Sequence, residues 1–217
     1  MKNKKYKLIV QYDEFCESPR EWDNLGKLIC WHGDYSLGDE HNFKRPVDFL
    51  GDLASKVDNE KAEKIEEKEY EGVIGEGEAC SKYLKIIDKN YIIFPVYLLD
   101  HSILKLSIED FNCKWDSGQV GFVYIPLKEA IGNNKKEKME YCKKVINGEL
   151  EIYNYYLNGE VYSFIVGVYN EDDELIEEYD SCGGFYGYNI YENGMIDYIP
   201  EELNIELSSD FAPDYMI

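Results

Sequence analysis

No lysine, arginine or histidine occurs after Lys144, a stretch of 73 residues in a chain of 217. The same stretch contains 17 carboxylates, and the formal net charge of the whole chain is -21. A charge so one-sided repels nucleic acid and destabilises a compact state through self-repulsion. We therefore do not expect direct nucleic-acid binding. We expect the stretch either to serve solubility or to match a strongly basic partner.

Long apolar runs are also lacking. The most apolar segment, Tyr91–Leu99, is far shorter than the 18 or so residues that a membrane span requires. The sequence Met1–Tyr6 is basic but leads into only a brief apolar stretch, without a signal-peptide core. We therefore expect no membrane association and a location in the cytoplasm of a host cell.

Motifs for metals and phosphates are missing as well. The six cysteines form no CxxC pair and histidine occurs three times, so no zinc motif is present. Cysteines of this kind in a cytosolic chain are typically reduced and pack as small hydrophobic residues. The glycine-rich segment Gly72–Gly77 lacks the lysine of a phosphate-binding loop. We expect no cofactor.

What the sequence does contain is enough apolar material for a folded core. Hydrophobic residues make up 44% of the chain and aromatic residues 15%, which is too apolar for a disordered acidic tail. Tyrosine is frequent after residue 150, and it suits strands that bury a ring and leave a hydroxyl in water. The acidic third of the chain is therefore expected to be folded.

The hydrophobic pattern predicts an α+β fold with a mainly antiparallel sheet and about three helices on one side of it. The predicted helices cover residues 46–57, 76–88 and 134–147, the first with proline in its first turn and the last stopped by Gly148. The predicted strands before residue 145 cover residues 5–12, 25–31, 91–99 and 120–125.

Residues 145–217 are predicted to form an acidic β-meander. Two Asn-Gly pairs, at 158–159 and 193–194, favour tight hairpin turns. The predicted strands of the meander cover residues 149–157, 160–169, 174–180, 186–191 and 195–199.

The domain prediction is a single domain over residues 1–217. The first half of the chain has too few predicted strands to close a core alone. The segment 58–71 is charged almost throughout and carries both signs. Such a segment is typical of a helical extension or a solvated connector.

The acidic meander is the main candidate for partner binding. Alternate residues of a strand share a face about 6.6 Å apart, and neighbouring strands lie about 4.8 Å apart. We therefore expect a lattice of carboxylates, formed by Glu174, Glu178 and Asp180 against Glu177 or by Glu149 and Glu151 beside Glu160. DNA presents about one negative charge per 1.7 Å of its axis. A rigid acidic sheet edged by tyrosines can therefore imitate nucleic acid in the basic cleft of a nuclease, whereas the alternative is a solvated face. The candidate partner-binding residues are Glu171, Asp172, Asp173, Glu174, Glu177, Glu178, Asp180, Tyr186, Tyr188 and Tyr191.

A second candidate site lies at the end of the most apolar strand. Asp100, His101 and Ser102 follow that strand, and Asp116 and Ser117 come soon after. These residue types can act in general acid–base catalysis, which would make Asp100, His101 and Asp116 catalytic. The structural alternative is local hydrogen bonding at a strand end and in a turn.

Two further groups of residues carry weaker signals. His32 and His41 flank three carboxylates and offer ligand types for a divalent ion, but no spacing template fits, and a polar loop is the favoured interpretation. Cys182 lies among carboxylates that disfavour its thiolate, so the glycines at 183–184 are better explained by a β-bulge.

Several short motifs are spread over most of the chain: Pro19–Gly26, Leu37–Asp39, Asp100–Ser102, Trp115–Gly121, Gly159–Tyr162 and Asp180–Gly187. Taken together, they resemble a family of small acidic proteins carried by phages and mobile elements of Gram-positive bacteria. This chain differs in having Leu98 and Leu99 before Asp100, where an aromatic residue is usual. The resemblance transfers no functional residue. It implies that the chain acts against host defence, as anti-restriction or anti-CRISPR proteins do.

Charge pattern and resemblance together predict a non-enzymatic, phage-type inhibitor. It would bind a bacterial defence nuclease stoichiometrically, for example a Cas9-type effector or a restriction enzyme, through an acidic surface that mimics nucleic acid. The expected partner is a basic nucleic-acid-binding protein of the host. The alternative is a hydrolase, or a binder of nucleotide signals, that uses the cleft at Asp100, His101 and Asp116.

Overall fold

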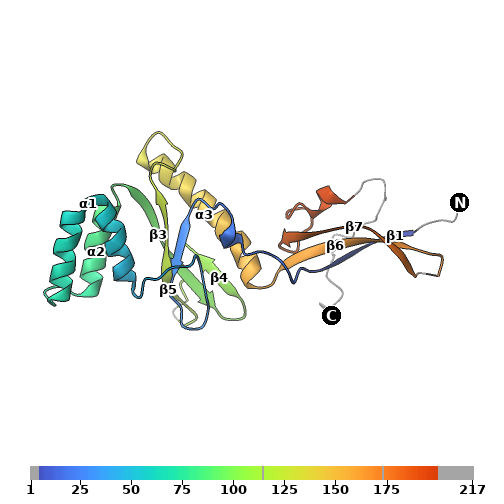
Figure 1. The fold of residues 1–217 in the computed structure, drawn as a ribbon, viewed down its shortest axis with the longest axis horizontal. Coiled ribbons are helices and arrows are strands. Elements are labelled where there is room, and N and C mark those ends of the chain that lie inside the picture. Colours follow the sequence, from blue (N-terminus) through green and yellow to red (C-terminus); the bar gives the residue numbers. More distant parts are fainter. Residues whose placement is uncertain (1–4, 114, 173, 200–217) are drawn as a thin grey trace. The chain divides into compact units, whose positions relative to one another are not determined.

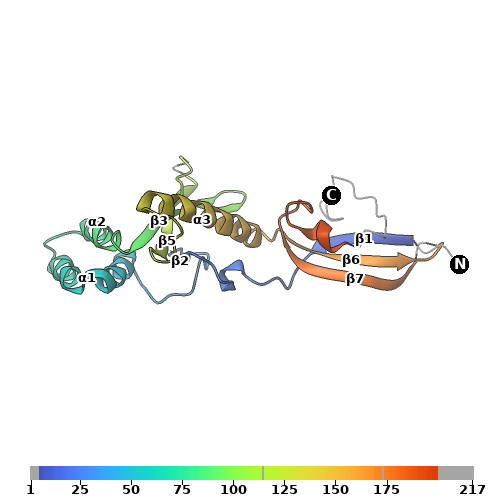
Figure 2. The same cartoon turned by 90° about the horizontal axis from the view of Figure 1, so that it is seen from above.

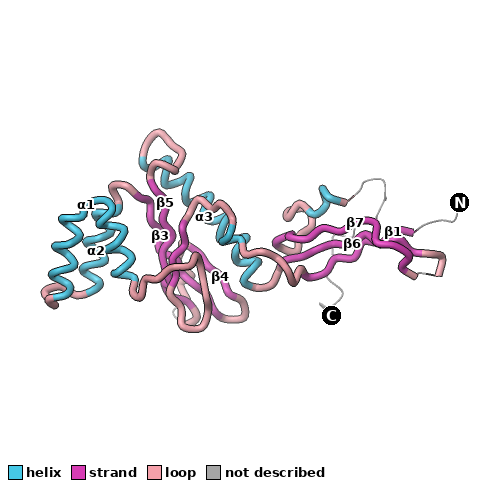
Figure 3. Tube along the Cα trace, viewed as in Figure 1, coloured by secondary structure: helices cyan, strands magenta, loops and turns pink. Residues whose placement is uncertain are grey.

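The computed structural model describes residues 5–113, 115–172 and 174–199. This part of the chain contains three α-helices and seven strands, and the strands form two antiparallel sheets (Figures 1 and 3). The α+β class is confirmed. The chain divides into two compact units, one of Met1–Pro19 with Ile152–Ile217 and one of Arg20–Glu151. The single domain expected from the sequence stays a prediction, and the helix α3 (Lys135–Leu157) contains the boundary between the two units.

The unit Arg20–Glu151 contains a four-stranded sheet in the order β2-β5-β3-β4. Three of its strands were predicted from the sequence to within a few residues, whereas the short β4 was not. Successive residues of a strand point to opposite faces, so each strand contributes to a core on either side. The strands are β2 (Lys27–Cys30), β3 (Tyr91–Asp100), β4 (Leu104–Ser107) and β5 (Ser117–Pro126).

Helices α1 (Pro46–Tyr70) and α2 (Glu76–Ile87) pack on one face of this sheet (Figure 1). The buried side chains of Phe49, Leu50 and Ile87 join Ile29 of β2 in one hydrophobic core. The charged segment 58–71 is helical up to Tyr70, with a local break at Asp58, where φ is -154° and ψ is 86°. In the structure this segment continues helix α1.

Helix α3 lies on the other face of the sheet and is longer than predicted (Figure 1). The prediction of helices on one side only is therefore wrong. So is the prediction of a strand over residues 149–157. Gly148 does not stop the helix, because a glycine inside a helix costs only about 1 kcal/mol. The buried stripe of Cys142, Ile146, Leu150 and Tyr153 continues through it at helical spacing.

The second unit contains a three-stranded sheet in the order β1-β6-β7 (Figure 2). It is built from β1 (Lys5–Tyr12), β6 (Val161–Tyr169) and β7 (Leu175–Tyr186). On one face, Phe164 and Val166 of β6 are fully buried, and apolar residues of the segment after β7 cover them. Tyr12 of β1 stacks on Tyr162, with ring centroids 5.2 Å apart. The central strand β6 is thus the most buried part of the unit.

The strands predicted over residues 186–191 and 195–199 are wrong. The chain forms a short 3-10 helix, Met195–Tyr198, and buries Ile190 and Met195 against the sheet. Both Asn-Gly pairs have glycines with positive φ, +69° at Gly159 and +81° at Gly194, but neither makes a hairpin. Gly159 ends helix α3 instead, because a left-handed glycine suits a helix end as well as a tight turn.

No helix in the described ranges is long and apolar enough to cross a membrane.

Candidate functional site

The described candidate carboxylates and Tyr186 lie on the edge strand β7 and on the turn before it, whereas Tyr188 and Tyr191 follow the strand (Figure 2). β7 pairs with β6 on one side, and its side chains from Leu175 to Ser181 are exposed. Six of the seven predicted carboxylates are described, and all six are exposed; Asp173 lies outside the described residues. They are Glu171, Asp172, Glu174, Glu177, Glu178 and Asp180.

The turn before β7 is ordered by Asn170. Its side-chain oxygen accepts hydrogen bonds from the backbone N–H groups of Asp172 and Glu174, at 3.0 and 2.8 Å. Its backbone N–H donates to the Glu174 carbonyl at 3.0 Å, and its side-chain amide donates to the Glu174 carboxylate at 2.9 Å. Glu171 and Asp172 are therefore displayed on a hydrogen-bonded turn.

The carboxylates of β7 point to both sides of the sheet. Glu177 and Asp180 lie opposite Val168 and Val166, which face the core, whereas Glu178 lies opposite Gly167 on the other face. The register shifts between Val166 and Gly167, so β7 has an irregularity that changes the alternation. The structure thus presents an acidic edge rather than a lattice on one face. Because Glu149 and Glu151 lie in a helix, they form no strand row beside Glu160.

No base forms an ion pair with these carboxylates within the ranges that the structure describes. Lys7 of β1 lies opposite Gly167 of β6, with the central strand between it and β7. Its ammonium group sits 4.6 Å from the ring centroid of Tyr169. Among the described residues, no paired base therefore neutralises the negative charge of the β7 edge.

The three candidate tyrosines differ in their availability. The hydroxyl of Tyr186 donates a hydrogen bond to the Glu17 carbonyl at 2.6 Å. Burial raises the pKa of Tyr186 to about 12, with a smaller contribution from Cys16 and nearby carboxylates. Tyr186 is thus part of the structure of the unit, whereas Tyr188 and Tyr191 are exposed and accessible to a partner.

Sequence reasoning missed three apolar residues of the same edge. Leu175, Ile176 and Tyr179 are 50%, 59% and 48% exposed, respectively. Their apolar character favoured burial, and only the position of β7 at the sheet edge leaves them in solvent. The edge is therefore both acidic and apolar.

The structure brings the alternative catalytic residues together. The backbone N–H of Asp100 donates to the Asp116 carbonyl at 2.8 Å, and Nδ1 of His101 lies 3.6 Å from Oδ2 of Asp116. The Tyr35 hydroxyl donates to Asp100 at 3.5 Å, and the charge of that carboxylate raises the pKa of Tyr35. The His101 side chain is 72% exposed, so water is not excluded from this group.

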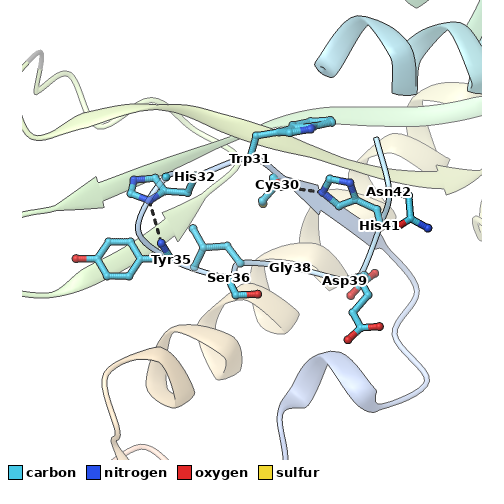
Figure 4. A pocket seen from close by; sticks show the side chains of 12 residues that line it. Cys30, Trp31, His32, Tyr35, Ser36, Gly38, Asp39, His41 and Asn42 are labelled. Carbon is cyan, nitrogen blue, oxygen red and sulfur yellow. Dashed lines mark hydrogen bonds between the residues drawn. The ribbon is translucent and has the colours of Figure 1, made fainter. Parts of the chain in front are cut away.

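The loop from His32 to His41 lines a surface depression of about 810 Å³ (Figure 4). Nδ1 of His32 accepts hydrogen bonds from the backbone N–H groups of Asp34 and Tyr35, at 3.2 and 3.3 Å. Nε2 of His41 bonds the Cys30 carbonyl at 2.8 Å. No group of three or more metal-ligating side chains occurs in the part of the chain that was described. These contacts fit a polar loop.

Arg20 and Asp39, from two of the motifs quoted above, form a buried ion pair with Glu149 nearby. Glu149 accepts hydrogen bonds from the backbone N–H groups of Leu25 and Gly26, at 2.6 and 3.3 Å. Burial raises the pKa of the Glu149 carboxyl, and these two bonds and Arg20 oppose that rise. Arg20 and Asp39 of the motifs thus have structural contacts within the unit Arg20–Glu151.

No protein-family model, no curated protein and no solved structure matches this chain. A function therefore has to be inferred from its own residues.

Proposed function

We propose that this chain inhibits a nucleic-acid enzyme by binding its cationic groove with the β7 edge. The partner class that the charge pattern favours is a defence nuclease of a bacterial host, such as a Cas9-type effector or a restriction enzyme. The observation that carries the proposal is the exposed run of carboxylates from Glu171 to Asp180, with no paired base in the described residues.

The spacing of the charges indicates the kind of groove. From Glu174, just before β7, to Asp180, four carboxylates span six residue steps, which is roughly 20 Å and a mean spacing of about 7 Å between successive charges. One DNA strand carries about one charge per 3.4 Å, whereas the duplex carries about one per 1.7 Å. The charge density of the acidic edge is therefore nearer to that of a single strand, such as guide RNA or unpaired DNA, than to that of a duplex.

Charge complementarity sets how the complex forms. Attraction between opposite surfaces speeds association and suppresses wrong partners. The screening length is about 10 Å at 0.1 M salt and about 3 Å at 1 M, so exposed carboxylates lose their reach at high salt. Binding is expected to weaken as salt is added, mainly through a slower association rate.

The test is inhibition of purified nucleases by a charge-neutral variant. In Glu177→Gln/Glu178→Gln/Asp180→Asn the shapes of the side chains are kept and three charges are removed. The matched control is Glu67→Gln/Glu71→Gln/Glu129→Gln, which removes three exposed carboxylates of the other unit. We expect cleavage by a sensitive nuclease to stop at one equivalent of the wild type or control. At low salt, the β7 variant should require at least tenfold more protein.

Full inhibition by the β7 variant at low salt would show that the acidic edge is not the binding surface. Competition with single-stranded DNA gives an independent readout, since a mimic and the nucleic acid cannot occupy one groove together.

A second candidate function rests on the contact of His101 with Asp116, 3.6 Å apart, beside Asp100. A hydrolase or nucleotide-signal binder that uses these residues would turn over or bind small nucleotides. It would lose that activity in His101→Ala and keep it in the β7 variant. The two candidates therefore respond to opposite sets of substitutions.

A further inference from the structure

β7 is a long strand at the edge of its sheet. Edge strands expose a row of unpaired backbone N–H and C=O groups, and proteins commonly guard them with lysine, proline, bulges or short length. β7 runs over 12 residues and contains neither lysine nor proline, and its register against β6 is irregular at three points. The opposite edge of the same sheet, β1, carries Lys7. The two edges of one sheet thus differ in the lysine that discourages pairing.

The open part of the β7 edge has a definite length. At its C-terminal end, the backbone N–H of Gly184 donates to the Asp13 carboxylate at 2.8 Å, and that of Ser181 donates to its neighbour Asp180 at 2.8 Å. At its N-terminal end, the turn at Asn170 closes on Glu174. Residues 175–180 lie between these local contacts. Six residues is the usual length of a strand.

The side chains of this open part are two apolar residues, two carboxylates, a tyrosine and a further carboxylate, in that order. Leu175, Ile176 and Tyr179 are about half exposed, and Glu177, Glu178 and Asp180 stand among them. Tyr179 contacts Tyr6 edge to face, with ring centroids 5.6 Å apart. The edge therefore offers an added strand both apolar contacts and partners for positive charge.

We propose that residues 175–180 receive an extended, lysine- or arginine-bearing segment of the partner protein as a fourth strand of this sheet. The inference rests on the proposed function, since it gives the acidic edge its mode of binding. In such strand addition, backbone hydrogen bonds supply affinity and alternate side chains supply specificity.

Charge identifies the occupant. Opposite charges across a strand pair stabilise it, and like charges directly opposite destabilise it. A second copy of β7 would place carboxylates against carboxylates. The chain's own residues 200–217 contain five carboxylates and no base, so they are repelled in the same way. A basic segment from another protein is the occupant that the edge favours.

The test uses two synthetic peptides of equal charge. One is an eight-residue peptide that alternates lysine and valine. The other has the same sequence with N-methyl groups on its four central residues, which removes the backbone donors needed for pairing on either edge. We expect the parent peptide to bind the full chain and to slow amide hydrogen exchange in residues 175–180 at least tenfold. The N-methylated peptide should bind at least tenfold more weakly.

Equal binding of the two peptides, without exchange protection in residues 175–180, would overturn the added strand and leave charge-driven binding intact. Equal binding of the parent peptide by wild type and by Glu177→Gln/Glu178→Gln/Asp180→Asn would overturn both the basic occupant and the proposed function. Self-association of the chain with protection of residues 175–180 would overturn the partner strand in favour of a second copy.

Discussion

Arg20 donates two parallel hydrogen bonds to Asp39, from Nε to Oδ1 at 2.8 Å and from Nη2 to Oδ2 at 3.1 Å. The Arg20 side chain is only 5% exposed, and Nη2 also donates to the Gly26 carbonyl at 2.7 Å. Asp39 in turn accepts the backbone N–H of Leu28 at 3.0 Å. The Arg20–Asp39 pair therefore connects the segment before β2, the strand β2 itself through Leu28, and the loop after β2.

Removing one partner of this pair is expected to be costly. Arg20→Leu leaves the Asp39 carboxylate buried without its cation, which typically costs about 3–5 kcal/mol. The free energy of unfolding from urea titration measures the loss. Lys56→Met is the control, because the pair of Lys56 with Asp52 is exposed and such pairs contribute about 1 kcal/mol or less. Equal stability of the two variants would mean that the Arg20 pair contributes no more than a surface contact.

Gly148→Ala is expected to stabilise the protein by about 0.5–1 kcal/mol. Gly148 lies inside α3, and a Cβ atom there meets nothing within 4 Å. Alanine restricts the unfolded chain and favours the helix. If the helix ended at Gly148, as the sequence predicts, alanine would instead destabilise the chain. Thermal unfolding of the variant decides between the two outcomes.

Gly121→Ala is expected to destabilise the β2–β5 pairing by about 2 kcal/mol or more. A Cβ atom at Gly121 would clash with the Ile29 carbonyl oxygen and lie 2.9 Å from Cα of Cys30. Gly118→Ala, in the same strand, meets nothing within 4 Å and serves as the matched control. Urea unfolding of both variants measures the difference. Similar values for the two would show that β2 does not approach β5 so closely.

Tyr186 is expected to lose its proton at a higher pH than an exposed tyrosine. Its pKa of about 12 in the folded chain lies above the value of about 10 for an unfolded chain. Between these pH values the unfolded chain has lost the proton and the folded chain has kept it, so stability falls as pH rises through this window. The difference between the ultraviolet titration curves of the wild type and of Tyr186→Phe measures the pKa of Tyr186. A midpoint near 10 would mean that the ring is not buried.

The elements that were predicted well are those that local pattern determines. The strand 5–12 alternates cleanly, the apolar segment Tyr91–Leu99 has few alternatives, and Pro46 marks a helix start. The wrong predictions at the end of α3 arise because one local signal is compatible with two structures. Gly148 and Asn158-Gly159 carry stop and turn signals, but the buried stripe through Leu150 and Tyr153 keeps the helix intact.

The acidic residues of the candidate site were found from composition, but their arrangement was not. Sequence cannot show that β7 lies at an edge, because the order β1-β6-β7 depends on the pairing of β1 with β6, about 150 residues away in the chain. The irregularity near Gly167 also redirects Glu178 to the opposite face. Side-chain direction on such a strand depends on a register that is set by tertiary contacts.

The acidic sheet is assembled from the two flanks of the chain, with the whole unit Arg20–Glu151 inserted between its first two strands. During translation at about 5–20 residues per second, β1 therefore emerges roughly 8–30 s before β6 can meet it. The inserted unit has time to fold in that interval. The anionic edge therefore forms after the inserted unit, and a nascent chain lacks this edge until β7 has been synthesised.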